Sequence, residues 1–380
     1  MNNKIYLSSP HIGDTEQKYV KEAFSTNWIA PIGPNVDRFE KSISNYIEPD
    51  VKSCVLSSGT AAIHLALKLL NVKRDDFVLV QSFTFCGTTN PVSYIGANII
   101  FVDSEKTTWN MCPISLENAI KDNLDKPIKA IIPVHLYGMP YQVDEIKNIS
   151  IKYGIPVIED SAEALGSSYK SIKCGAFGDI SVLSFNGNKI ITTSGGGAIV
   201  SNNTEYVNKA KFLSTQARDS AAHYQHSEIG YNYRMSNVLA GIGIGQMEVL
   251  DKRVQQRRRN NHRYRQFFKD IPGIKLQTEP SNDFFSNYWL TAIIIEPELT
   301  GGITREDVRI AFENKNIESR PLWKPMHLQP VYRGTKFYGE GVCEEFFEKG
   351  LCLPSSSSLE IQDFERIFDV LTKTLMKHDF

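Results

Sequence analysis

The chain of 380 residues is 41% apolar and carries 42 basic and 43 acidic side chains, for a net charge of −1. This length suffices for two or three domains and a large buried core. The charge balance excludes a general nucleic-acid binder, which needs a positive surplus, but leaves open one local basic pocket for a phosphorylated ligand.

The six cysteines stand far apart, so neither a metal site nor a dithiol motif is predicted. No apolar run resembles a signal peptide or a membrane span, so we expect a cytoplasmic protein.

Seven short apolar runs between residues 53 and 201 alternate with helix-like segments. Their near-continuous Val, Ile, Leu and Phe content is typical of strands covered on both faces of a sheet. The clearest helix between them is 60–70, which follows the small residues Ser57-Ser58-Gly59. We therefore expect an α/β fold with a mostly parallel seven-stranded sheet, and the short spacing of the last runs predicts one antiparallel strand. The runs are 53–57, 76–81, 98–103, 129–135, 155–160, 180–185 and 197–201.

The character of the chain changes after Met235. One long helix is expected from there to about Phe268, and its basic block is typical of a solvated helix face. A strand at 287–295 and helices at 304–314 and from 361 onward predict a smaller α+β unit. We therefore divide the chain into a large domain, 1–250, and a small domain, 251–380. The string Gly241-Ile242-Gly243-Ile244-Gly245 lacks the dinucleotide Gly-x-Gly-x-x-Gly spacing and lies in a helical pattern, which favours close helix packing.

Lys189 stands between two predicted strands, in a polar turn that reads Asn186-Gly187-Asn188-Lys189. It has two interpretations. An ordinary turn lysine points to water, and position alone favours this one. A lysine held in a dry pocket instead presents a nucleophilic amine to a carbonyl group.

Asp160 ends the apolar run 155–160. Ligands of open α/β sheets gather at the carboxyl ends of strands, and a buried carboxylate needs a cation or a strong donor beside it. A protonated pyridine nitrogen is such a partner. The alternative is a helix N-cap, since Ser161-Ala162-Glu163 follows.

Two further strand ends carry candidate ligand-binding residues. The turn at Gly59 and Thr60 offers N–H groups and a hydroxyl to a phosphate, or else serves only to start a well-capped helix. The run 81–86 contains two aromatic residues, Phe83 and Phe85, and an aromatic residue at this strand end either stacks on a planar ring or belongs to the core. A reactive amine, a carboxylate, a phosphate cradle and an aromatic plate together match what pyridoxal phosphate requires.

These motifs resemble those of the DegT-type nucleotide-sugar aminotransferases, which are fold type I enzymes using pyridoxal phosphate. The likeness covers nearly the whole chain, from Leu7 to Ser355. The resemblance implies a Schiff base between Lys189 and the cofactor, pairing of Asp160 with the ring nitrogen, and stacking of Phe85 on the ring. It implies further cofactor contacts at Gly59, Thr60, Glu163 and Ser184.

Other segments of the resemblance concern the partner and the substrate. Asn232 is similar to the asparagine that reaches the phosphate of the neighbouring subunit, which implies a homodimer with shared active sites. The run Ser194-Gly195-Gly196-Gly197, where the family commonly has Gly-Glu-Gly-Gly, resembles the branch that aminates UDP-4-keto-6-deoxy-N-acetylglucosamine for surface polysaccharides. Substrate contacts are expected at Arg234, Arg320, Lys324 and His327.

The reaction implied is a ping-pong transfer, in which glutamate gives its amino group to the cofactor and carbon 4 of the keto sugar then receives it. Lys189 moves the proton, and Asp160 keeps the ring nitrogen protonated. GDP- and dTDP-linked keto sugars are the alternative substrates. Three other functions are less favoured: a dehydratase of the same family has histidine in place of Lys189, a nicotinamide oxidoreductase needs the missing glycine fingerprint, and a regulator needs a DNA-binding appendage.

Overall fold

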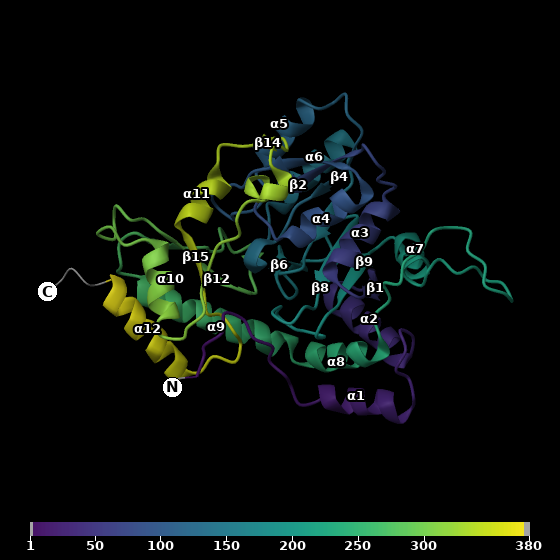
Figure 1. Ribbon diagram of the computed structural model, residues 1–380, viewed down its shortest axis with the longest axis horizontal. Helices are drawn as coiled ribbons and strands as arrows, with labels where there is room; N and C mark the ends of the chain where they lie inside the picture. Colours follow the sequence, from purple (N-terminus) through teal and green to yellow (C-terminus); the bar gives the residue numbers. More distant parts are fainter. Residues whose placement is uncertain (1–2, 376–380) are drawn as a thin grey trace.

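The computed structural model describes residues 3–375, and all seven expected strands are present in it (Figure 1). Thr60 and the residues after it form the expected helix, α3 (Gly59–Leu69), immediately after the first strand. The strands are β1 (Lys52–Leu56), β2 (Phe77–Gln81), β3 (Asn98–Val102), β4 (Ile128–Ile132), β5 (Ile158–Asp160), β8 (Ile180–Ser184) and β9 (Gly197–Ser201).

These strands form one continuous sheet. Two ladders, β14-β3-β2-β4 and β1-β9-β8-β5, are joined where Ile131 pairs with Val157 and Val134 pairs with Asp160. The pairs from β3 to β8 are parallel, whereas β9 runs antiparallel to both β1 and β8, which confirms the prediction of one antiparallel strand. The edge strand β14 (Phe337–Tyr338) was not expected, and it pairs with β3 in parallel.

Alternate residues of the strands face two cores, as the two-sided apolar composition requires. On β1, Cys54 and Leu56 pack with α3 and α7, whereas Val55 packs with α2 and α8 on the other face. Farther along the sheet, Leu79 and Ile100 pack with α5 and α6. The helices of this part are α1 (Glu16–Ser25), α2 (Pro34–Ile47), α4 (Cys86–Ile95), α5 (Pro113–Lys121), α6 (Val143–Tyr153), α7 (Thr204–Ser214) and α8 (Asn237–Glu248).

The C-terminal part has its own antiparallel sheet, in the order β10-β12-β15-β13. Helices α9, α10 and α12 pack on this sheet around Phe312 and Ile367. The expected small α+β unit is therefore present. Its elements are α9 (Leu250–Phe268), β10 (Ile274–Leu276), β12 (Thr291–Ile295), α10 (Arg305–Glu313), β13 (Arg320–Pro321), α11 (Val342–Lys349), β15 (Gly350–Leu353) and α12 (Ile361–Leu375). Minor elements are β6 (Ser168–Tyr169), β7 (Ile172–Lys173), β11 (Phe284–Phe285), η1 (Leu136–Gly138), η2 (Met326–Leu328) and η3 (Pro330–Tyr332).

The prediction of one unbroken helix from 235 to 268 is wrong. The helix breaks at Val249, where α8 ends and α9 begins. α8 packs in the large core and α9 runs toward the smaller sheet, so the two helices serve different cores. The glycines of α8 do serve close packing, because a Cβ at Gly243 would lie 2.5 Å from the ring of Phe39 on α2.

The proposed domain boundary at residue 250 falls at this break, but two segments cross it. Ile5 pairs with Ile317 and lies in the smaller core. β14 comes from the C-terminal part and extends the large sheet. Within 3–375, no helix has both the length and the apolar character needed to span a membrane.

Candidate active site

A cavity of about 280 Å³ lies at the carboxyl ends of the parallel strands, where ligands of α/β sheets bind. Trp289 and Trp323, from the C-terminal part, complete its wall. The fold thus brings together seven of the residues predicted to contact the cofactor. These are Gly59, Thr60, Phe85, Asp160, Glu163, Ser184 and Lys189.

The turn after β8 carries the side chain of Lys189 into this cavity. The Lys189 backbone N–H donates to Asn186 O at 3.0 Å, and the side chain is only 11% exposed. Its amine Nζ lies 3.4 Å from Glu163 Oε1 and 4.2 Å from the centre of the Trp289 ring. The interpretation of Lys189 as a turn lysine in open water is therefore wrong, and the amine lies in a shielded pocket.

Asp160 ends β5 with its carboxylate enclosed. Oδ2 accepts a hydrogen bond from the Thr88 hydroxyl at 2.7 Å, and Oδ1 accepts one from the Ala162 N–H at 3.1 Å. Residues 161–167 form turns and no helix, so the N-cap interpretation is wrong. Burial raises the pKa of Asp160, and the Thr88 hydrogen bond acts in the opposite direction. A cation placed beside this carboxylate would stabilise its charged form.

Glu163 is the second carboxylate of the cavity. Its Oε2 accepts a hydrogen bond from the Tyr137 N–H at 2.7 Å, while Oε1 faces Lys189. Burial raises the pKa of Glu163, the nearby Lys189 lowers it, and Asp160 raises it further. Two enclosed acids therefore share one amine, an arrangement that favours a ligand carrying an additional positive charge.

The turn at the start of α3 both caps the helix and borders the cavity. It can therefore be a helix cap and a phosphate site at the same time. Ser58 Oγ accepts the Ala61 N–H at 3.0 Å, which satisfies one amide of the first helical turn. A Cβ on Gly59 would lie 3.1 Å from Ser184 Cβ, and one on Gly197 would lie 2.4 Å from the Ser58 carbonyl carbon. These glycines therefore bring a helix N-terminus close to the end of β8, in a form suited to an anion.

Phe85 precedes α4 and is 54% exposed on the cavity wall, so its interpretation as a core residue is wrong. Its ring centre lies 5.6 Å from that of Trp323. Trp323 is in turn 5.9 Å from Tyr137. An aromatic surface therefore extends from the α4 side of the cavity to the C-terminal part.

Asn232 lies outside the cavity of its own chain. It pairs with Thr215 at the base of a loop that extends from the end of α7 (Figure 1). The loop is exposed both near its tip, with Tyr224 at 79%, and close to Asn232, with Ile229 at 85%.

None of the four residues predicted to contact substrate lines the cavity. The Arg234 guanidinium is enclosed and pairs with Glu40, with 2.6 Å between Nη1 and Oε1, because a buried cation needs a nearby anion. Arg320 pairs with Glu318 at 3.0 Å and borders a separate cavity. Within this chain, neither guanidinium reaches the cavity, and each is paired with a glutamate.

His327 and Lys324 lie close to the cavity without entering it. His327 Nδ1 lies 2.7 Å from Ser82 Oγ, and Nε2 lies 3.1 Å from Glu344 Oε1. The His327 ring also stacks on Phe337 at 3.8 Å. Both of its nitrogens are therefore engaged by protein groups in this structure, and a substrate contact at His327 stays a prediction. Lys324 is exposed next to Trp323.

Residues 10–372 match the model of the DegT/DnrJ/EryC1/StrS aminotransferase family. The chain belongs to this family. A relative in Bacillus subtilis (strain 168), EpsN, whose name proposes a pyridoxal phosphate-dependent aminotransferase, is 48% identical over 98% of this chain and 96% of its own length. GDP-perosamine synthase of Escherichia coli O157:H7 is 35% identical over 93% of this chain and 94% of its own length.

Two further similarities bear on substrate and fold. The UDP-4-amino-4,6-dideoxy-N-acetyl-beta-L-altrosamine transaminase of Campylobacter jejuni subsp. jejuni serotype O:23/36 (strain 81-176) is 33% identical over 91% of each chain. Spr1654 of Streptococcus pneumoniae, named as a proposed sugar aminotransferase and solved in a PLP form, has a TM-score of 0.90 at 25% identity over 99% of each chain. The predicted α/β fold of type I is thereby confirmed.

Pyridoxal phosphate fits the residues that this aminotransferase presents. The cavity joins a glycine-lined helix start to an enclosed carboxylate, so a phosphate and a ring cation each meet a suitable group. The amine of Lys189 lies in the same space. Gly59, Thr60 and Ser184 would hold the phosphate, Asp160 the ring nitrogen, and Phe85 the ring face.

Sequence reasoning missed Thr88 and Trp289 in this aminotransferase. Thr88 lies within α4, and its hydrogen bond to Asp160 depends on where the fold places α4 relative to β5. Trp289 precedes β12, one hundred residues after Lys189 in the chain, and reaches the cavity only through the docking of the smaller unit. No local pattern signals either contact.

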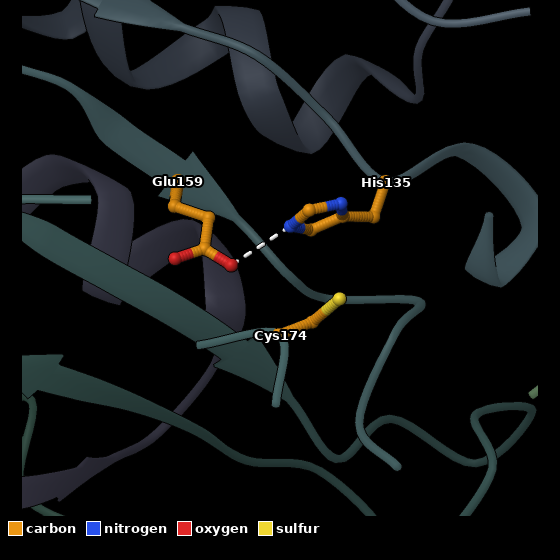
Figure 2. A group of neighbouring side chains, drawn as sticks. All are labelled: His135, Glu159 and Cys174. Atoms are coloured by element: carbon orange, nitrogen blue, oxygen red, sulfur yellow. Dashed lines mark hydrogen bonds and ion pairs between the residues drawn. The ribbon is translucent and has the colours of Figure 1, made fainter. Parts of the chain in front are cut away.

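Behind Asp160 lies a second group of buried polar side chains, His135, Glu159 and Cys174, whose ligand atoms are within 4.8 Å of one another (Figure 2). His135 Nε2 lies 2.7 Å from Glu159 Oε1, and the Tyr141 N–H donates to His135 Nδ1. The Glu159 carboxylate also accepts hydrogen bonds from two serine hydroxyls and three backbone N–H groups. Because these bonds occupy the lone pairs that a metal ion would need, we interpret the group as a structural anchor of β5.

Proposed function

We propose that this sugar aminotransferase, which uses pyridoxal phosphate, moves an amino group from glutamate to carbon 4 of UDP-4-keto-6-deoxy-N-acetylglucosamine, for surface polysaccharide synthesis. The observation that carries the proposal is one cavity that holds a shielded amine, an enclosed carboxylate and a helix N-terminus suited to phosphate. The side chains are Lys189, Asp160 and the turn at Gly59 and Thr60.

Each group has a defined task in the proposed reaction. When bound, pyridoxal phosphate supplies an aldehyde that accepts amines and a ring that accepts the electron pair left by a departing proton. With the cofactor bound, the Lys189 amine would hold its aldehyde carbon, and the same amine, when free, would be placed to move a proton to or from the donor carbon. Asp160 would keep a proton on the ring nitrogen. Glu163 faces the Lys189 amine and keeps it within the cavity.

The choice of a UDP-linked sugar rests on similarity. The name of the Campylobacter relative includes a UDP-linked amino sugar. In addition, the run Ser194-Gly195-Gly196-Gly197 resembles the UDP-sugar branch of the family. GDP-perosamine synthase, at slightly higher identity, keeps a GDP-linked sugar as the alternative. The name of EpsN does not distinguish the two nucleotides.

We further propose a homodimer with shared active sites. Asn232 lies at the base of the exposed loop after α7, where it is free to approach a second chain. In a two-fold dimer, each chain would lend this amide to the phosphate in the cavity of its partner.

The chemistry can be tested without a sugar. Purified protein loaded with pyridoxal phosphate is reduced with borohydride, and we expect the pyridoxyl mass on the peptide that contains Lys189. Lys189→Ala should lose the adduct, whereas Lys170→Ala, which changes an exposed lysine paired with Asp144, should retain it. An adduct that persists in Lys189→Ala would contradict the assignment.

The substrate is then tested with glutamate and a panel of UDP-, GDP- and dTDP-linked 4-keto-6-deoxy sugars. We expect turnover of the UDP-linked sugar, with the new amine at carbon 4 in the NMR spectrum of the product. Turnover of only a GDP- or dTDP-linked sugar, or amination at carbon 3, would contradict the substrate assignment and leave the lysine chemistry intact.

A further inference from the structure

Trp289 contacts the turn of Lys189 in two ways. The indole is 1% exposed and forms part of the cavity wall. Its ring face lies 4.2 Å from Lys189 Nζ, and its Nε1–H donates to Asn188 O at 2.6 Å. One side chain from the smaller unit thus fixes both the backbone before the lysine and the amine at its end.

The same backbone oxygen is held from a second direction. Ser8 Oγ donates to Asn188 O at 2.6 Å, and Arg257 Nη2 donates in turn to Ser8 Oγ at 2.9 Å. Arg257 Nη1 donates to the Trp289 carbonyl oxygen. Three segments therefore meet at the turn of Lys189: the N-terminal segment through Ser8, α9 through Arg257, and the segment before β12 through Trp289.

Arg257 is an unusual anchor, because its guanidinium is 1% exposed and has no carboxylate partner within residues 3–375. Burial, with Arg253 nearby, lowers the pKa of Arg257 to about 9, and its Nε has no hydrogen-bond partner. A buried cation without an anion is unfavourable for folding. Its hydrogen bonds are directed at the two groups that hold Asn188 O, which points to a role in placing that turn.

We propose that Trp289 is a positioning residue for Lys189, supported from behind by Ser8 and Arg257. The inference rests on the proposed role of Lys189, and it concerns the state in which the amine is not joined to the cofactor. A free lysine side chain samples many rotamers, and an indole face favours those that keep Nζ over the ring, where the ammonium group gives up a proton to water before the amine attacks. Trp289 thereby keeps the amine close to the point where it must capture a carbonyl carbon.

The test measures capture of pyridoxal phosphate by the apoprotein. Absorbance near the visible band of the bound cofactor gives the rate, and borohydride reduction with peptide mass analysis gives the site. We expect Trp289→Phe, which loses the N–H and weakens the ring contact, to slow capture about tenfold. Pyridoxine 5′-phosphate, which lacks the aldehyde, reports on binding alone, and its affinity for Trp289→Phe should fall much less than the rate of capture does.

Two further variants separate positioning from general loosening. Trp109→Phe removes an indole from the same hydrophobic cluster without touching the Lys189 turn, and it should capture at the unchanged rate. Ser8→Ala removes a partly exposed donor to Asn188 O with little risk to folding, and it should slow capture about threefold.

The outcomes distinguish this inference from the proposed function. Capture by Trp289→Phe at the unchanged rate, or equal slowing in Trp289→Phe and Trp109→Phe, would overturn the positioning role. No labelled Lys189 in the unchanged protein would instead overturn the proposed chemistry.

Discussion

Glu159 and Asp160 are neighbours on β5, yet the fold shifts their pKa values in opposite directions. Because strand residues alternate between faces, Asp160 points to the cavity and Glu159 points behind it. Burial alone would raise the pKa of Glu159, but the hydrogen bonds from His135, Ser181 and the backbone lower it to about 2. Asp160 has only Thr88 and Ala162 as donors, so burial prevails and its pKa is raised. The number of hydrogen-bond donors therefore separates the two roles. Glu159, with many donors, anchors the sheet, whereas Asp160, with few, can pair with a cation of a ligand.

Glu159→Gln should destabilise the fold in a pH-dependent way. The depressed pKa of Glu159 means that its contribution is present above about pH 4.5 and is lost as the pH falls toward 2. The loss at neutral pH should be about 3 kcal/mol in urea unfolding, and it should shrink below pH 4.

Glu117→Gln is the matched control for this variant. Hydrogen bonds from Lys152 and Lys121 also lower the pKa of Glu117 to about 2, but this carboxylate lies at the surface, where water screens its ion pairs. We expect little change in its unfolding curve. If Glu117→Gln lowered the free energy of unfolding as much as Glu159→Gln, burial would not be the reason for the large contribution of Glu159.

Thr88→Val should impair the site more than the fold, because the Thr88 hydroxyl bonds Asp160 and also the buried Thr84 hydroxyl. The substitution keeps the shape of the side chain and removes the hydroxyl that donates to Asp160. The pKa of Asp160 should rise further, because a hydrogen bond to its charged form is lost. We expect about a tenfold loss of kcat, with Thr88→Ser near the unchanged value. Equal activity in Thr88→Val and Thr88→Ser would show that the hydroxyl plays no part.

At the scale of elements, the glycines of α8 let three helices approach closely. The ideal Cβ positions of Gly241, Gly243 and Gly245 lie within 3 Å of atoms from α1 or α2. Bulkier residues there would push α1 and α2 away from the large core. The helix needs its glycines for packing, at the expense of intrinsic helix propensity.

Gly243→Ala should therefore destabilise the protein although alanine favours helices. The new methyl group would meet the enclosed ring of Phe39 at 2.5 Å, and such overpacking costs about 2 kcal/mol, more than the propensity gain of about 1 kcal/mol. Urea unfolding measures the difference. Lys41→Ala, on the exposed side of α2, should leave stability unchanged or slightly higher. A stabilised Gly243→Ala would contradict the packing argument.

At the scale of the whole molecule, the cavity belongs to neither sheet alone. The large sheet supplies Lys189 and Asp160, whereas Trp289 and Trp323 come from the C-terminal part. His327 links the end of β2 at Ser82 to Glu344 on α11 and so ties the two parts beside the cavity. Relative movement of the two parts would open this wall.

The proposed sharing of sites between subunits predicts complementation. Lys189→Ala and Asn232→Ala chains, co-expressed with different tags, should form mixed dimers with one intact site each. Random assembly would then restore about a quarter of the unchanged activity, above either variant alone. Purified mixed dimers with no more activity than the parents would contradict shared sites.

The sequence by itself determined the strands, because two-sided burial leaves continuous apolar runs that are readable locally. It also determined the residues that end those strands, so the lysine, the carboxylates and the phosphate turn were identifiable through spacing and family resemblance. The resemblance added Phe85 and Ser184, and the cavity contains both.

Only the tertiary structure decided which neighbours those residues meet. The break at Val249, the pairing of β14, the engagement of Arg234 with Glu40 and the approach of Trp289 to Lys189 all join segments far apart in the chain. Such contacts follow from how helices and sheets pack, and packing depends on the sum of many weak apolar contacts, which no single motif contains.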